Sequence, residues 1–138
     1  MTTYIVRGTD GTVIRAGSND LRIIGIEFYT GTGGLDNGWM YTTTSATISG
    51  GTVTTPVAAK AGAPASTATA RVGAGATTSG TLSMVGTYYL GSTTTSASRM
   101  VWQPLGDLII ASSGTFMIYG GADVTVTWFE ELRLSWSY

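Results

Sequence analysis

Short runs of β-branched and aromatic residues recur along the chain, and clusters of Gly, Ser, Asn and Asp separate them. Apolar residues do not repeat at helical spacing over three turns, so the pattern favours strands. It predicts ten strands, at residues 3–7, 12–16, 21–29, 39–48, 66–72, 82–90, 99–103, 107–111, 115–119 and 123–135. For a chain of 138 residues, this number of strands predicts a single domain over residues 1–138, an all-β, jelly-roll-like antiparallel β-sandwich.

The predicted strand at residues 21–29 is apolar on both faces. One face carries Ile24, Ile26 and Phe28, and the other carries Leu21, Ile23 and Tyr29. A strand that is apolar on both faces is usually covered on both sides. We therefore expect a loop or another subunit to cover the second face.

The predicted strand at residues 123–135 alternates between apolar and polar residues with one irregularity. Glu130 falls on the apolar face and Phe129 on the polar face. Because successive side chains of a strand point to opposite faces, a β-bulge near residues 129–131 would restore the phase. We expect a bulge there.

The segment 52–65 contains small, almost uncharged residues and includes two prolines. A connection of this length inside a compact domain is usually functional or disordered. Its composition favours an extended arm that lies on a neighbouring subunit. Its hypothetical partner contacts are Pro56, Val57, Lys60 and Pro64.

The chain contains no His and no Cys, which excludes much catalytic and metal chemistry. It has no Ser-His or Cys-His nucleophile, no disulfide and no thiolate zinc site. The glycine runs at 31–34 and 73–76 lack the Lys-Ser/Thr pair and the following helix of a phosphate loop. The adjacent carboxylates Glu130 and Glu131 point to opposite faces of a strand. The sequence predicts a protein that is not an enzyme and that has no catalytic residue, cofactor or metal.

Charged residues make up only 11% of the chain, and the formal net charge is −1. Soluble domains contain about 25% charged residues, whereas here Thr, Ser and Gly supply 58 of the 138 positions. This balance predicts no nucleic-acid partner and no membrane partner, and no run resembles a signal peptide or a membrane span. Because interface centres are depleted in charge, the composition favours a surface that neighbouring subunits cover.

Aromatic residues could instead form a sugar-binding platform on one face of the sandwich. The candidates are Trp39, Tyr41, Tyr88, Tyr89, Trp102, Trp128, Trp136 and Tyr138. Trp128 alternates with valines, and Tyr88 alternates with Leu82 and Met84, which is typical of core or interface packing. A carbohydrate-binding domain therefore stays open as an alternative, and it predicts exposed Trp and Tyr in a shallow groove.

Three stretches carry a resemblance to a known group of proteins. They are residues 64–71 (PASTATAR), 102–110 (WQPLGDLII) and 124–131 (VTVTWFEE). In this order they resemble the small, Gly/Thr/Ser-rich decoration (cement) proteins on the heads of tailed bacteriophages. Members of that group are all-β, often jelly-roll-like and commonly trimeric, and they do no chemistry.

The resemblance implies a virion structural protein that binds the outer face of the major capsid protein shell and stabilises the head. It also implies self-association as a homotrimer, a position on the outer capsid surface and synthesis in the bacterial host cytoplasm. Two alternatives stay open: a receptor- or carbohydrate-binding domain of a phage fibre, and another virion protein such as a collar or head-fibre base.

Overall fold

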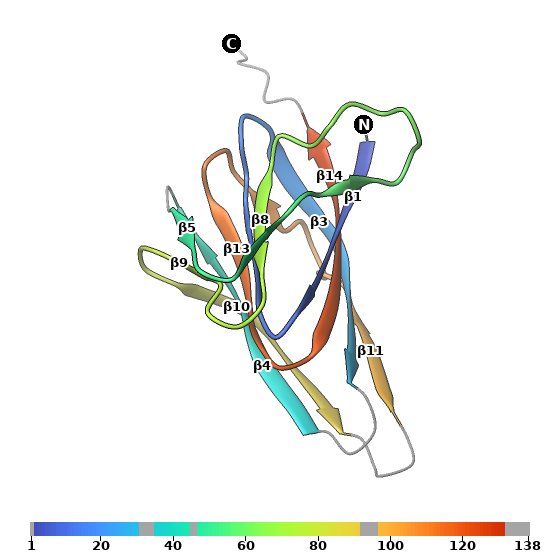
Figure 1. Ribbon diagram of the computed structural model, residues 1–138, viewed down its shortest axis with the longest axis vertical. Coiled ribbons are helices and arrows are strands. Elements are labelled where there is room, and N and C mark those ends of the chain that lie inside the picture. The colour runs from blue at the N-terminus through green and yellow to red at the C-terminus, as the bar shows by residue number, and fades with distance from the viewer. Residues whose placement is uncertain (1, 31–34, 45–46, 92–96, 132–138) are drawn as a thin grey trace.

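The computed structural model describes residues 2–30, 35–44, 47–91 and 97–131, and these fold into two antiparallel sheets packed face to face (Figure 1). The first sheet contains, in spatial order, β11 (Ser98–Trp102), β3 (Asp20–Thr30), β14 (Asp123–Glu131), β1 (Thr2–Thr9) and β7 (Val57–Ala58), and β12 (Ile109–Ile110) also pairs with β3. The second sheet contains β10 (Ser83–Gly91), β4 (Leu35–Thr43), β13 (Thr115–Gly120), β2 (Thr12–Arg15), β8 (Thr69–Val72) and β6 (Thr52–Thr54). A separate ribbon pairs β5 (Ile48–Ser49) with β9 (Thr77–Thr78).

The order of the main strands is that of a jelly roll. The eight main strands are β1, β2, β3, β4, β10, β11, β13 and β14. Numbered one to eight along the chain, they form one sheet in the order 1-8-3-6 and the other in the order 2-7-4-5. This arrangement consists of two interlocked Greek keys. The prediction of an all-β, jelly-roll-like sandwich is therefore confirmed, and a strand lies at or beside each of the ten predicted positions.

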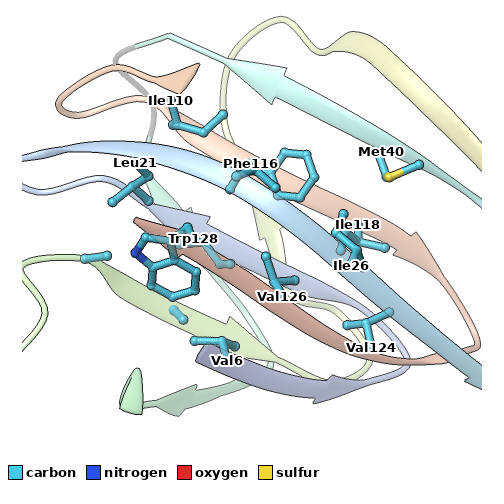
Figure 2. Packing of buried hydrophobic residues seen from close by; sticks show 14 of the residues in the cluster. Val6, Leu21, Ile26, Met40, Ile110, Phe116, Ile118, Val124, Val126 and Trp128 are labelled. Carbon is cyan, nitrogen blue, oxygen red and sulfur yellow. The ribbon is translucent and has the colours of Figure 1, made fainter. Parts of the chain in front are cut away.

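The core lies between the two sheets and follows the alternation along each strand. Figure 2 shows Val124, Val126 and Trp128 of β14 facing the interior, together with Phe116 and Ile118 of β13. All five side chains are buried. Burying an apolar side chain of this size contributes about 1.5–3 kcal/mol each, so the facing strands β13 and β14 form a large part of the stabilising contact.

A β-bulge interrupts the pairing of β3 with β14. Thr127 pairs with Gly25, but the next residue of β14, Trp128, pairs with Ile23. Ile24 is therefore the extra residue, and it lies on β3. A bulge of this kind shifts the phase of the strand that carries it.

The bulge explains why β3 looks apolar on both faces in the sequence. Leu21 and Ile23 precede the extra residue, Ile26 and Phe28 follow it, and all four are buried. Because the bulge reverses the alternation of side chains between the two pairs, all four side chains point to the inner face of β3. The expectation that a loop or another subunit covers a second apolar face of this strand is therefore wrong.

The expectation of a β-bulge near residues 129–131 is also wrong. β14 runs through consecutive residues in its pairing with both β1 and β3. Its alternation therefore continues to the end of the strand, where Glu130 is only 7% exposed and Phe129 is half-buried on the outer face. A carboxylate lies at the end of the core because other groups satisfy it.

The segment 52–65 lies against this chain's own sheets. β6 pairs with β8 at the edge of the second sheet, and β7 pairs with β1 at the edge of the first. The amide of Ala59 donates to the carbonyl of Thr3 (2.8 Å), and the hydroxyl of Tyr4 donates to the carbonyl of Pro64 (2.8 Å). The segment thus crosses between the two sheets, and the following loop arches beside the N-terminus (Figure 1). This differs from the expected extended arm, because the open edges of β1 and β8 offer backbone groups for the segment to pair with.

Candidate functional site

Both edges of the sandwich expose apolar side chains, and the first edge is formed by β6 and β7. There Val53 and Val57 are 64% and 65% exposed. Val57 lines a hollow of about 340 Å³ together with Ile5, Val6, Arg7, Thr54 and Thr55. We call this surface the 52–58 edge. Its apolar side chains are surrounded by threonine hydroxyls, which is the arrangement of an apolar interface centre with a polar rim.

The opposite edge is formed by β10, β11, β12 and the loop between β11 and β12. Val85, Val101, Leu105 and Ile109 are exposed there, and Leu105 is fully open to solvent. A hollow of about 350 Å³ lies among Val85, Trp102, Gln103, Pro104, Leu105, Gly106, Asp107 and Leu108. We call this surface the 101–109 edge. Natural sheets usually protect edges of this kind with charged residues, and two exposed ion pairs lie beside these apolar side chains, Arg22–Asp107 (3.4 Å) and Arg99–Glu27 (2.7 Å).

The four residues expected to contact a partner are divided between two places. Val57 lies in β7 opposite Ile5, and Pro56 is half-buried beside it, so both belong to the 52–58 edge. Lys60 and Pro64 are exposed in the loop that follows. Their contact with a partner stays a prediction, and the structure brings only the first two together.

The 101–109 edge is a surface that the alternation of the sequence does not predict. Leu105 and Ile109 occur in the 102–110 stretch that carries the resemblance, but the alternation alone could not place them outside the core. An available signal was the Pro104-Leu105-Gly106 turn, because a large apolar residue in a turn between two short strands usually cannot reach the core.

The outer face of the second sheet carries a groove with an aromatic floor. Trp39 of β4 and Tyr119 of β13 are paired neighbours, and their ring centroids are 6.0 Å apart with an interplanar angle of 35°. On one side lies a hollow of about 520 Å³, whose polar lining includes Asp10, Asn37 and Thr77. We call the floor and the hollows beside it the aromatic groove.

A second hollow of about 310 Å³ continues the aromatic groove. It shares Trp39, Met117 and Tyr119 with the first and adds Tyr41 and Leu82. Tyr119 is 56% exposed, whereas Met117 is mostly covered by the β5–β9 side of the groove, through Ala76 and Ile48. The carbohydrate-binding alternative predicts exposed Trp and Tyr in a shallow groove; in this groove Tyr119 is exposed, whereas Trp39 and Tyr41 are half-buried.

Tyr89 of β10 is exposed and pairs with Asn37 of the aromatic groove, whereas Trp102 lines the hollow of the 101–109 edge. Tyr88 and Trp128 are buried in the core, where Tyr88 stacks on Phe28 with a centroid distance of 4.2 Å. Their interpretation as packing residues is confirmed. Trp136 and Tyr138 lie outside the described residues.

Glu130 accepts hydrogen bonds from four residues at the end of the core. The hydroxyl of Ser66, the amide and hydroxyl of Thr67 (3.2 and 3.3 Å), Nε1 of Trp128 (3.3 Å) and Nδ2 of Asn19 (3.4 Å) all donate to its carboxylate. Burial raises the pKa of Glu130, but these hydrogen bonds outweigh it and hold the pKa below its usual value. The carboxylate thus ties the loop before β8 to the end of β14, which is a structural role.

Within the ranges that the structure describes, Asp and Glu side chains form no group of three or more that could hold a metal ion. The same ranges contain no helix long and apolar enough to cross a membrane. Comparisons of the chain with protein-family models, with curated proteins and with solved structures gave no match.

Proposed function

We propose that this protein is a virion structural protein, a capsid decoration (cement) protein that binds the outer face of the major capsid protein shell and stabilises the head. The observation that supports this best is the presence of two different apolar edges on opposite sides of one sandwich. A subunit with two unlike contact surfaces forms heterologous contacts, which close into rings or continue across a lattice. Bridging of neighbours in this way is the task of a cement protein.

The chemistry of the edges fits burial against protein. Val53 and Val57 at one edge and Leu105 and Ile109 at the other are large apolar side chains held in solvent. Transfer of such a side chain out of water is favourable by about 1.5–3 kcal/mol when it is fully buried. Contacts of this size, repeated around a symmetric shell, add up through avidity.

The proposal assigns the protein two partners, the major capsid protein and further copies of itself in a homotrimer. Pro56 and Val57 would contribute to the contact through the 52–58 edge, and Lys60 and Pro64 through the adjoining loop. The protein would act on the outer capsid surface after synthesis in the bacterial host cytoplasm. Its contribution would be mechanical.

The test is co-sedimentation with heads of the phage or prophage that encodes the chain, prepared without this protein. We expect the wild-type chain to saturate the heads with at least one copy per capsomer. Val57→Asp and Leu105→Asp place a charge in the two edges and are expected to reduce the bound copies strongly. Tyr119→Asp is the control and should leave the bound copies unchanged, because Tyr119 is also more than half exposed but lies on the outer face of the second sheet, away from both edges.

Two outcomes would contradict the decoration proposal, and a third would contradict the assignment of its contact surfaces. The first is a wild-type chain that stays in the supernatant. The second is a bound copy number that matches one ring per particle, which would favour a collar or head-fibre base. The third is undiminished binding of both edge variants, which would mean that the edges are not the contact surfaces.

A further inference from the structure

We propose that the aromatic groove binds a neutral oligosaccharide through stacking on Trp39 and Tyr119 and through hydrogen bonds to Asp10 and Asn37 at its polar end. This inference goes beyond the decoration function and does not depend on it. The groove and the two edges use different residues, so the two proposals can fail separately.

The floor of the groove is held rigidly before any ligand arrives. β4 is paired on both sides, with β10 and β13, and β13 is paired with β4 and β2. Trp39 and Tyr119 therefore project from two central strands of the sheet. Aromatic side chains on such strands form a fixed apolar surface, and little conformational entropy is lost when a ligand binds. The C–H face of a pyranose ring is flat and apolar, and it stacks on a surface of this kind.

The polar end supplies both kinds of hydrogen-bonding group. Asp10 lies in the two-residue turn between β1 and β2, where its φ is 60° and that of Gly11 is 114°. Its carboxylate can only accept hydrogen bonds, whereas the amide of Asn37 and the hydroxyl of Thr77 can donate and accept. A sugar hydroxyl also donates and accepts, so neighbouring hydroxyls of one ring can use all three groups.

The sparse charge of the groove selects a neutral ligand. Among the residues that line its two hollows, Asp10 is the group that carries a charge near neutral pH. A carboxylate at the polar end repels phosphates, uronic acids and sialic acids. Nucleic acids and acidic polysaccharides are therefore disfavoured.

A proline-rich peptide is the main competing ligand, because such peptides also bind aromatic-lined grooves. Proline has no backbone N–H, so a peptide of this kind presents mainly carbonyl acceptors. The carboxylate of Asp10 has no proton to donate to them. A ligand with hydroxyl donors fits the polar end better.

The length of the groove indicates more than one sugar unit. The hollow at the polar end has a volume of about 520 Å³, and the one beside Tyr41 and Leu82 has a volume of about 310 Å³. Both fall in the range of about 300–1,000 Å³ that is typical of small-molecule sites. They meet at Trp39, Met117 and Tyr119, so a chain of sugars could extend across the aromatic floor from one hollow to the other.

The experiment is an array of immobilised neutral and acidic oligosaccharides, probed with the full chain and followed by calorimetric titration with soluble versions of the bound sugars. We expect neutral oligosaccharides to bind and acidic ones not to bind. Tyr119→Ala and Trp39→Ala should each weaken binding roughly tenfold, and Asp10→Asn should weaken it less. Tyr29→Ala, an exposed tyrosine on the first sheet, is the matched control and should leave the affinity unchanged.

Several results would overturn the saccharide proposal. They are the failure of every neutral oligosaccharide on the array to bind the folded chain, a preference for acidic sugars, and displacement of the bound sugar by a proline decapeptide at equal affinity. Undiminished binding by Tyr119→Ala would have the same meaning. If Trp39→Ala fails to fold, Tyr119→Ala decides the question, because its side chain is more than half exposed and its loss leaves the core intact.

Discussion

Replacement of Glu130 by Gln should destabilise the protein although the two side chains have nearly the same shape. The carboxylate accepts hydrogen bonds from Ser66, Thr67, Trp128 and Asn19. A Gln side chain keeps one acceptor oxygen and turns the other position into a donor. At least one of the present donors then faces an N–H group in place of an oxygen.

The magnitude follows from the burial of this cluster. A hydrogen bond to a charged group contributes about 1.5–3 kcal/mol, and a buried donor left without a partner costs about 1–3 kcal/mol. Trp128 is fully buried, so its Nε1–H cannot turn to water. Since the losses within one cluster are not additive, we expect Glu130→Gln to lower the free energy of unfolding by about 2–3 kcal/mol. For a chain of this length, that corresponds to a Tm lower by roughly 10 °C.

The effect should depend on pH with a definite sign. The pKa of Glu130 is lowered from 4.5 in the folded chain, so folding favours the ionised carboxylate. Its contribution is therefore fully present above pH 4.5 and is lost as the pH falls through the folded-state pKa. Gln cannot ionise, so the difference between wild type and Glu130→Gln should shrink in acid.

The assay is urea unfolding followed by tryptophan fluorescence, for both proteins, at about pH 7 and about pH 3. The expected result is a clear gap between the two unfolding midpoints at the higher pH and a smaller gap at the lower pH. Equal stability at about pH 7 would refute the assigned hydrogen bonds. A gap that is the same or larger in acid would refute the lowered pKa.

Two further predictions concern the fold. Deletion of Ile24 removes the extra residue of the bulge and should leave Leu21, Ile23, Ile26 and Phe28 in phase on the inner face of a regular strand. Deletion of Glu27 instead keeps the bulge and should move Phe28 to the outer face, at a cost of about 1.5–3 kcal/mol in chemical unfolding, and a larger loss for the Ile24 deletion would count against the bulge assignment. Gly38→Ala should lower the Tm through a loss of about 1–3 kcal/mol, because the added Cβ would collide with the carbonyl of Tyr119 and the ring of Tyr88, and an unchanged Tm would contradict this packing.

The aromatic groove illustrates what the sequence could indicate about a site. Trp39 and Tyr41 were candidates for a sugar-binding platform from residue type alone, and their alternation with buried Met40 places them on one face of a strand. Tyr119 was missed, because it joins them only through the pairing of β4 with β13. Asp10 was missed for the same reason, since it reaches the groove from the turn after β1.

The segment 52–65 shows the same limit. Its length and composition marked it as unusual, and Val57 is indeed exposed. The sequence could not show that β6 and β7 would pair with β8 and β1, because the open edges that attract them belong to distant parts of the chain.

Local alternation therefore determined most of the strands and the sandwich class, because the side-chain period of a strand depends only on neighbours in sequence. The phase of β3 and the burial of Glu130 were decided by tertiary structure. The bulge at Ile24 exists only in the pairing with β14, roughly a hundred residues later in the chain. Glu130 can remain in the core because Ser66 and Thr67, which lie in a separate loop, donate hydrogen bonds that offset the free-energy cost of burying its carboxylate. The register of a strand and the hydrogen bonds of a buried polar group both depend on partners that are distant in sequence. The packed tertiary structure therefore decides them.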